Sequence, residues 1–224
     1  MGKGIRTGYA FDFGNYPQGR FLAAEERKRV KEGTEAADEF PVKPIRWQVL
    51  EVRPDEGIAL IVTKQALAGR TFHAQGAYPG WEKSDMRAWL NGEFFAQAFN
   101  EAEKELVQAV TVRNDASEDC RGSRSGGADT EDRVFLLSSR EARDYFADSV
   151  ARRCTLSALA KSQGAYSDDE GDCCWWLRSP GEYEDNCTFV SYGGSYSYDK
   201  PVYMKGFAVR PALWVKYAAL VKQA

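Results

Sequence analysis

The sequence predicts a mixed α+β fold in which short helices surround a small antiparallel sheet. Three observations support this class: a hairpin pattern over residues 44–62, helix-capping residues at several points before residue 160, and only strand and turn patterns from Cys173 onward. The chain has 224 residues, a length common for one mixed domain, so we expect a single domain over residues 1–224. We also expect its N- and C-terminal strands to pair.

The first predicted element is a β-hairpin. Residues 44–52 alternate apolar and polar side chains, and residues 58–62 form an apolar run. The segment between them, 53–57, contains Pro54 and Gly57, which are typical of turns. Two strands with one buried face are therefore expected here.

Two short helices are predicted after the hairpin. Ser84 is a favourable N-cap residue for the first helix, whose apolar positions are Met86, Trp89, Leu90, Phe94 and Phe95. Asn100 with Glu103 three residues later has the capping-box pattern. We expect this second helix to continue through Leu106 and Val107.

The middle of the chain contains a polar stretch followed by further elements. Residues 114–132 are almost free of apolar side chains and contain several glycines, so we expect a mobile surface loop. Residues 134–137 are predicted to form a buried strand, and Ser138 with Glu141 to cap another helix. A further helical stretch is expected near residues 156–160.

Composition excludes several classes of protein. Hydrophobic residues make up 43% of the chain and charged residues 28%, which is typical of a folded, water-soluble protein without a membrane span. The formal net charge of −3 provides no basic field for nucleic acid, so we expect a ligand that is a protein or a neutral molecule. The first residues have no apolar stretch of the secretory type, which favours a cytoplasmic protein and leaves surface display by another route open.

The five cysteines, Cys120, Cys154, Cys173, Cys174 and Cys187, have neither a C-x-x-C pair nor a paired metal-ligand spacing. We expect all five to be reduced thiols, with no bound metal and no cofactor.

Two sequence blocks in the last third carry a family resemblance. Residues 174–181 read CWWLRSPG and residues 208–215 read AVRPALWV. Matching blocks occur upstream in the same order, at residues 13–18, 44–50, 86–91 and 134–138. The pattern resembles a bacterial domain of unknown function related to the formylglycine-generating-enzyme branch of the C-type lectin fold. The resemblance covers nearly the whole chain and implies a C-type lectin scaffold that binds a ligand.

In some relatives of that family, the segment between the two blocks is the variable region of a diversity-generating retroelement. Adenine-directed mutagenesis there spreads Asn-type codons over many residue types. Five residues of the segment cannot arise from an Asn codon in this way: Glu182, Glu184, Lys200, Met204 and Lys205. Those positions are therefore constant, or this copy is not diversified.

Residues 182–207 have the composition of a binding surface. Tyrosines alternate with serines and glycines, as in antibody paratopes, where Tyr supplies contact area and Ser and Gly supply adaptable hydrogen bonding. The predicted ligand-binding residues are Tyr183, Asp185, Cys187, Phe189, Ser191, Tyr192, Ser195, Tyr196, Tyr198, Asp199 and Tyr203. We expect their aromatic side chains to be accessible and to lie on one face. The alternative is that they only cover the sheet, since Tyr–Ser alternation also suits a half-buried strand.

The flanking tryptophans and arginines are predicted to be structural. At least two of Trp175, Trp176 and Trp214 should lie in the core. Arg178 and Arg210 stand in apolar strand-like settings, where a guanidinium most often satisfies buried carbonyls or a carboxylate. We expect both arginines to hold loops in place.

No catalytic residues are predicted. His73 is the only histidine and has no supporting motif around it, so we expect a loop histidine and a protein that is not an enzyme. The acidic run Asp168, Asp169, Glu170 and Asp172 lacks the ligand spacing of a calcium loop and is expected to be solvated. Two alternatives remain: a family member with a structural or regulatory role and no diversification, and a divergent enzyme of the formylglycine-generating type.

Overall fold

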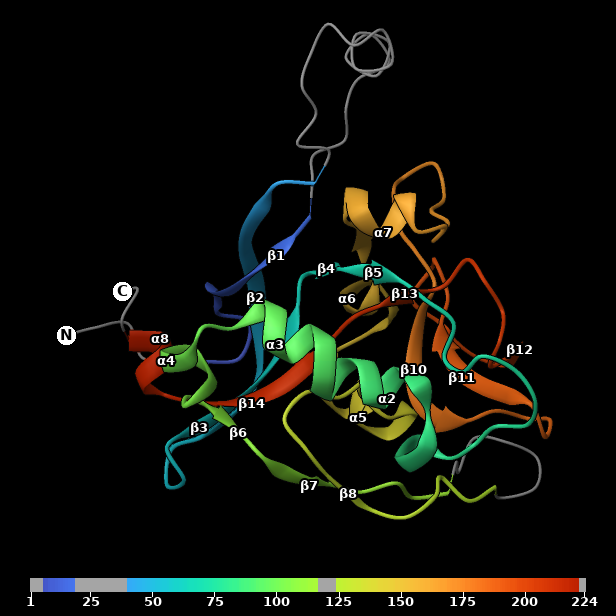
Figure 1. Cartoon of the computed structure of the whole chain (residues 1–224), viewed down its shortest axis with the longest axis horizontal. Coiled ribbons are helices and arrows are strands. Elements are labelled where there is room, and N and C mark those ends of the chain that lie inside the picture. The colour runs from blue at the N-terminus through green and yellow to red at the C-terminus, as the bar shows by residue number, and fades with distance from the viewer. Residues whose placement is uncertain (1–5, 19–39, 117–123, 222–224) are drawn as a thin grey trace, which may run out of the picture.

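A computed structural model describes residues 6–18, 40–116 and 124–221, and it is built on two five-stranded sheets. The first sheet contains, in spatial order, β1 (Ala10–Pro17), β2 (Val42–Arg53), β3 (Ile58–Thr63), β14 (Ala212–Lys216) and β6 (Val107–Gln108). The second contains β12 (Tyr196–Pro201), β11 (Asn186–Val190), β10 (Trp175–Pro180), β13 (Ala208–Val209) and β5 (Ala68–Gly69). Figure 1 shows β1 and β2 on one side of the molecule and β10 to β12 on the other. The mixed α+β prediction is confirmed.

The predicted hairpin is present. β2 and β3 pair antiparallel, with Val49 opposite Ile61, and Gly57 in the turn has a φ of 68° that favours glycine. β14 then pairs antiparallel with β3, so the C-terminal strand extends the sheet that the hairpin begins.

The expected pairing of the N- and C-terminal strands is wrong. β1 pairs with β2, whereas β14 lies between β3 and β6. Both edges of β14 are therefore already hydrogen-bonded, and the two terminal strands share a sheet without pairing.

The helices after the hairpin begin where the capping residues predict. The Ser84 hydroxyl accepts a hydrogen bond from the Arg87 N–H at the start of α2 (Asp85–Trp89). This helix follows a 3₁₀ turn, η1 (Trp81–Lys83), and continues through a π-helical turn, η2 (Leu90–Phe94), into α3 (Phe95–Ala98). In Figure 1 this helical segment crosses between the two sheets.

The capping box of Asn100 and Glu103 is also present, at the start of α4 (Glu101–Lys104). The helix is shorter than predicted. Val107 belongs to β6 and pairs with Val215, so tertiary strand pairing takes over the backbone hydrogen bonds that a longer helix would use.

The capping box of Ser138 and Glu141 begins α5 (Ser139–Tyr145), as predicted. Residues 134–137 are buried but form no strand; only Phe135 makes an isolated bridge, to Ala212. The other carbonyls of this run bond elsewhere: the Val134 carbonyl accepts from the Asn91 amide, and those of Leu136 and Leu137 accept from Arg178. Hydrogen bonds from the Asn91 side chain and from Arg178 thus take the place of the strand pairing that the sequence predicts.

The polar stretch 114–132 is structured at both ends. β7 (Val110–Val112) pairs with β8 (Thr130–Asp132), and Asn114 is buried. The Asp132 carboxylate is also buried and accepts hydrogen bonds from Trp81 at 2.8 Å and Arg87 at 2.7 Å. A surface loop over the whole stretch is therefore wrong at these ends, and residues 117–123 lie outside the described residues.

The remaining elements are short. β4 (Gln65–Ala66) pairs parallel with β9 (Thr155–Leu156), α6 is Ser149–Arg152, α7 is Ala158–Ser162 and α8 is Ala218–Val221. The helix expected near 156–160 begins only at Ala158, since Leu156 is in β9. α8 also shows that the region after Cys173 is not free of helix.

The buried apolar side chains of both sheets form one continuous cluster. Trp175 and Trp176 are fully buried and Trp214 is 7% exposed, which confirms the prediction that these tryptophans are core residues. Trp176 stacks on Phe207 with ring centroids 4.2 Å apart, and its indole N–H donates to the Arg70 carbonyl. Within the described part of the chain, no helix is long and apolar enough to cross a membrane.

Candidate functional site

The strand β10 supports the segment predicted to bind a ligand, and Arg178 anchors that strand. The side chain is 3% exposed and donates to the Leu136 carbonyl at 2.7 Å, the Arg113 carbonyl at 2.9 Å and the Asn114 amide oxygen at 3.2 Å. Its two terminal nitrogens also form a bidentate pair with the Glu141 carboxylate. One guanidinium therefore ties together three chain segments around β10.

Arg210 has the same kind of role next to the other block. Its guanidinium donates to the Thr63 carbonyl at 2.9 Å and the Arg152 carbonyl at 3.1 Å, and lies 5.0 Å from the centroid of the Trp175 ring. The prediction that both arginines hold loops in place is confirmed.

Two predicted binding residues lie in the core instead. Cys187 is fully buried and Phe189 is 4% exposed, because β11 is an inner strand whose residues are all buried. The Cys187 thiol donates to the Leu177 carbonyl, and the Phe189 ring packs edge-on against Phe207 at 4.8 Å. Alternation within residues 182–207 therefore does not place every aromatic side chain at the surface.

Two of the predicted tyrosines are partly covered. The rings of Tyr192 and Tyr196 pack against the edge of the core, and the Arg152 guanidinium lies 4.4 Å from the Tyr196 ring centroid. The Cys174 thiol lies beside Tyr192, and burial raises the pKa of both groups. These two tyrosines join the segment to the scaffold.

The remaining predicted residues reach the surface. Tyr183 is 60% exposed and Tyr203 44% exposed, and Ser195 and Asp199 are also exposed. Asp185, Ser191 and Tyr198 are half-buried. We call this set the display positions: Tyr183, Asp185, Ser191, Ser195, Tyr198, Asp199 and Tyr203.

Local contacts order part of this set. The Tyr203 hydroxyl donates to the Asp185 carboxylate at 3.1 Å, and this hydrogen bond raises the pKa of Tyr203. The Asp185 carbonyl in turn accepts from the Val202 N–H, so the two turns that flank β11 and β12 are joined. Tyr166, 65% exposed, donates its backbone N–H to the Gly206 carbonyl and lies against the same turn.

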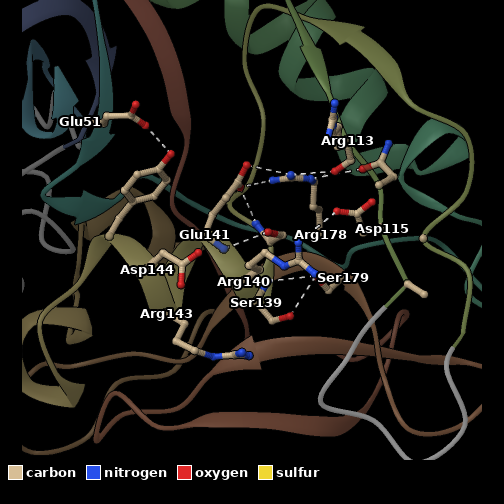
Figure 2. A pocket seen from close by; sticks show the side chains of 15 residues that line it. Glu51, Arg113, Asp115, Ser139, Arg140, Glu141, Arg143, Asp144, Arg178 and Ser179 are labelled. Carbon is tan, nitrogen blue, oxygen red and sulfur yellow. Dashed lines mark hydrogen bonds and ion pairs between the residues drawn. The ribbon is translucent and has the colours of Figure 1, made fainter. Parts of the chain in front are cut away.

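A polar cavity of about 520 Å³ lies away from the display positions and was not predicted from the sequence. It is bounded by α5, by residues 113–116 after β7, and by the ends of β2 and β10. Its charged lining residues are Arg113, Arg140, Arg143 and Arg178 with Glu51, Asp115, Glu141 and Asp144. Figure 2 shows the pair of Arg178 and Glu141 near the centre of the view and Glu51 to the upper left.

The interior of this cavity is internally hydrogen-bonded. The Tyr145 hydroxyl donates to Glu51 at 2.5 Å, and Arg53 bonds the same carboxylate at 2.8 Å. Burial, followed by the bond to Glu51, raises the pKa of Tyr145. Burial alone would raise the pKa of Glu51 too, but the hydrogen bonds from Arg53 and Tyr145 outweigh it and the net shift is downward.

The chemistry available in the cavity is charge pairing. Arg178 has its donors occupied and Arg140 pairs with Asp115 at 3.8 Å, whereas Arg113 is an exposed guanidinium of a kind that pairs with carboxylates or phosphates. The capping box at Ser138 predicts α5, but Glu51 and Arg113 reach the cavity from distant parts of the chain. Only the tertiary fold brings them together.

The other residues considered from the sequence have structural contacts. His73 lies in a loop with Nδ1 2.9 Å from the Asp85 carboxylate. Glu170 and Asp172 both pair with Arg153, and the expectation of a solvated acidic run is wrong for Asp172, which is buried. In the described residues, no three His, Cys, Asp or Glu side chains gather as metal ligands do. Cys154, Cys173, Cys174 and Cys187 are buried free thiols, and Cys120 lies outside the described residues.

Together, the fold and the site define a mixed α+β protein in which buried Trp and Arg residues support a Tyr- and Ser-bearing surface segment. The chain belongs to a family described as a domain of unknown function (DUF6273), whose model matches residues 56–217. No curated protein matches the chain. No solved structure matches it either.

Proposed function

We propose that this chain is a ligand-binding protein, without catalytic activity, that recognises a protein partner through the display positions. One observation carries the proposal. Among the described residues, six large hydrophobic side chains are exposed, and three of them, Tyr183, Tyr203 and Met204, lie within residues 182–207. A fourth, Tyr166, lies against Gly206 in the same segment. Exposed aromatic groups concentrated in this way are typical of interaction surfaces.

The chemistry of the segment supports recognition of a protein. Tyrosine provides a large amphipathic contact area with few rotatable bonds, and Ser191 and Ser195 provide small hydroxyl groups beside the Gly193–Gly194 turn. β12 is an edge strand whose one described strand partner is β11, and the Glu182 N–H also donates to its Tyr198 carbonyl. The inner strands β11 and β10 give this segment rigid support.

The finer part of the proposal is that the scaffold is a C-type lectin fold and that the segment is diversified by a retroelement. The order of the sequence blocks supports the first point, and the location of the display positions between the two last blocks supports the second. Under this proposal, we expect amino-acid differences between copies to occur at exposed positions and not at buried ones. Display positions should change, while Cys187 and Phe189 should stay constant because the core depends on them.

Sequencing of the locus tests the retroelement proposal. The expected result is a nearby reverse transcriptase gene and a near-copy of the coding stretch for residues 175–213, differing chiefly at adenines. The differences should fall in codons for the display positions. A locus with neither element would contradict the proposal and favour a family member without diversification, with a structural or regulatory role.

The absence of catalysis is tested separately. The full chain is titrated with copper and then incubated with a cysteine-containing sulfatase peptide. We expect no conversion of the cysteine to formylglycine. Conversion that depends on copper would overturn the proposal in favour of an enzyme of the formylglycine-generating type.

A further inference from the structure

Two buried cysteines face each other outside the display positions. Thr155 and Asp172 form an antiparallel bridge, which places Cys154 directly opposite Cys173 on the neighbouring segment. The Cys173 N–H donates to the Cys154 carbonyl at 2.8 Å, as expected for such a pair. Side chains of directly opposite residues lie on the same face, so both thiols point the same way.

The separation of this pair suits a covalent link. Opposite residues of a hydrogen-bonded antiparallel pair have Cα atoms about 5.5 Å apart, inside the range of roughly 4.4–6.8 Å that disulfides span. The two thiols lie close enough to influence each other's ionisation, and the Cys154 thiol donates to the Lys64 carbonyl at 3.6 Å. Cys174, the next residue, instead contacts Tyr192.

The surroundings make the two thiols unequal. Burial opposes ionisation of Cys154, but the hydrogen bond from Cys173 and the charge of Arg210 outweigh it and lower the pKa of Cys154. The hydrogen bond to Cys154, together with burial, raises the pKa of Cys173. The lowered pKa makes Cys154 the better nucleophile of the two thiols.

We propose that Cys154 and Cys173 are an oxidation site that forms a reversible disulfide when the protein meets a hydroperoxide. The Cys154 sulfur attacks one peroxide oxygen; an S–O bond forms, the O–O bond breaks, and the leaving oxygen departs as water for hydrogen peroxide. Cys173 then attacks the Cys154 sulfur, an S–S bond forms, the S–O bond breaks, and the Cys173 proton leaves with the hydroxyl as a second water. Two thiols are oxidised and one peroxide is reduced.

Access to the pair requires only local opening. Cys154 lies between two very short elements, α6 and β9, and the partner segment is held by isolated bridges at Ser167 and Asp172. Short elements with few ladder hydrogen bonds open more readily than the central strands of a sheet. Arg153 pairs with Glu170 and Asp172 across the two segments and favours the closed arrangement of this region.

The disulfide would close a loop that contains α7 and would fix the segment immediately before β10. Cross-linking restricts the unfolded chain, so oxidation should raise the melting temperature. It should leave the display positions unchanged, because these lie on other segments.

The test uses the full reduced chain, treated with hydrogen peroxide, then denatured, alkylated and digested without reductant. Mass spectrometry should find the peptides of Cys154 and Cys173 linked, with the loss of two hydrogen atoms. The melting temperature should rise by several degrees and return after dithiothreitol. Recovery of both cysteines alkylated, overoxidised or linked to other cysteines would overturn the proposal.

Variants separate this pair from the neighbouring thiols. Cys174→Ser and Cys120→Ser should keep the link and the temperature shift, whereas Cys154→Ala should lose both. Equal shifts in Cys154→Ala and the unsubstituted chain would also overturn the proposal. If Cys154→Ala does not fold, the peptide map of the unsubstituted chain decides the question alone.

Discussion

At the scale of single residues, buried charged side chains hold distant segments of the chain together. Arg178 is surrounded by carbonyls from segments far apart in sequence, and Glu141 supplies its counter-charge while also capping α5. A guanidinium in such a position cannot be replaced by a simpler group, because no single alternative satisfies all of its partners. The pair therefore links the WWLRSPG block to the helix that borders the polar cavity.

This role predicts a large effect for Arg178→Ala. Removing one partner of a buried pair leaves the other uncompensated, and we expect a loss of about 3 kcal/mol, near the low end of the usual range because Glu141 is partly exposed. Urea unfolding gives the free energy. Arg113→Ala, which removes an exposed guanidinium from the same cavity, is the matched control and should change stability by less than about 0.5 kcal/mol. Similar losses in both variants would contradict this role.

The bond between Tyr145 and Glu51 predicts a pH-dependent effect. Tyr145→Phe removes a hydrogen bond to a carboxylate, which should cost about 1.5 kcal/mol at pH 7. The folded-state pKa of Glu51 is lowered, so its contribution is present above the unfolded value of 4.5 and is lost as the pH falls through the folded pKa. The difference between variant and unsubstituted protein should thus shrink below pH 4.5. A difference that stays constant down to pH 3 would argue against it.

At the scale of elements, neighbouring strands differ in what they tolerate. β11 is an inner strand with every residue buried, while β12 beside it is an edge strand with intermediate exposure. Both strands contain aromatic and polar residues, since β11 reads NCTFV and β12 reads YSYDKP. Position in the sheet, rather than composition, decides which side chains are structural.

Phe189→Ala and Tyr183→Ala test this distinction. Phe189 is in the core and contacts Trp176 and Phe207, so its truncation should cost about 3 to 5 kcal/mol. Tyr183 is 60% exposed, and its truncation should change stability by no more than about 0.5 kcal/mol. Thermal and urea unfolding of the two variants provide the comparison. Equal destabilisation would mean that Tyr183 covers the sheet as Phe189 does.

Elements with local signals were predictable from the sequence. The caps at Ser84, Asn100 and Ser138 depend on residues three positions apart, and each begins a helix as expected. Elements whose structure depends on residues far away in the sequence were not predictable. Val107 joins a strand because Val215 lies beside it, and residues 134–137 lose their ladder to Arg178 and Asn91.

The residues of the candidate site also fall into those that local sequence patterns predict and those that they do not. Composition predicts a binding surface at residues 182–207, where Tyr183 and Tyr203 are exposed and Tyr192, Tyr196 and Tyr198 are half-buried. Alternation does not show that β11 is covered on both faces, and the prediction that Cys187 and Phe189 bind a ligand at the surface is therefore wrong. Glu51, Arg113 and Arg178 line the polar cavity from three separate parts of the chain. No local sequence pattern predicts that they lie together.

At the scale of the whole molecule, two sheets share one core, and the display positions lie at the margin of the second sheet. The core depends on buried Trp, Phe and Arg residues, whereas the display positions contribute little to it. We therefore expect that the display positions can be changed without unfolding the scaffold. A domain with about 5 to 15 kcal/mol of stability tolerates several exposed changes of about 0.5 kcal/mol each.

The most direct test of this separability is a library randomised at the display positions, with Cys187 and Phe189 kept, compared with a library randomised only at those two buried residues. Members are scored for soluble expression and a cooperative thermal transition. We predict that most members of the first library fold and that most of the second do not. If most members of the first library aggregate or melt without a transition, the tyrosines are sheet cover and residues 182–207 are not a separable recognition surface.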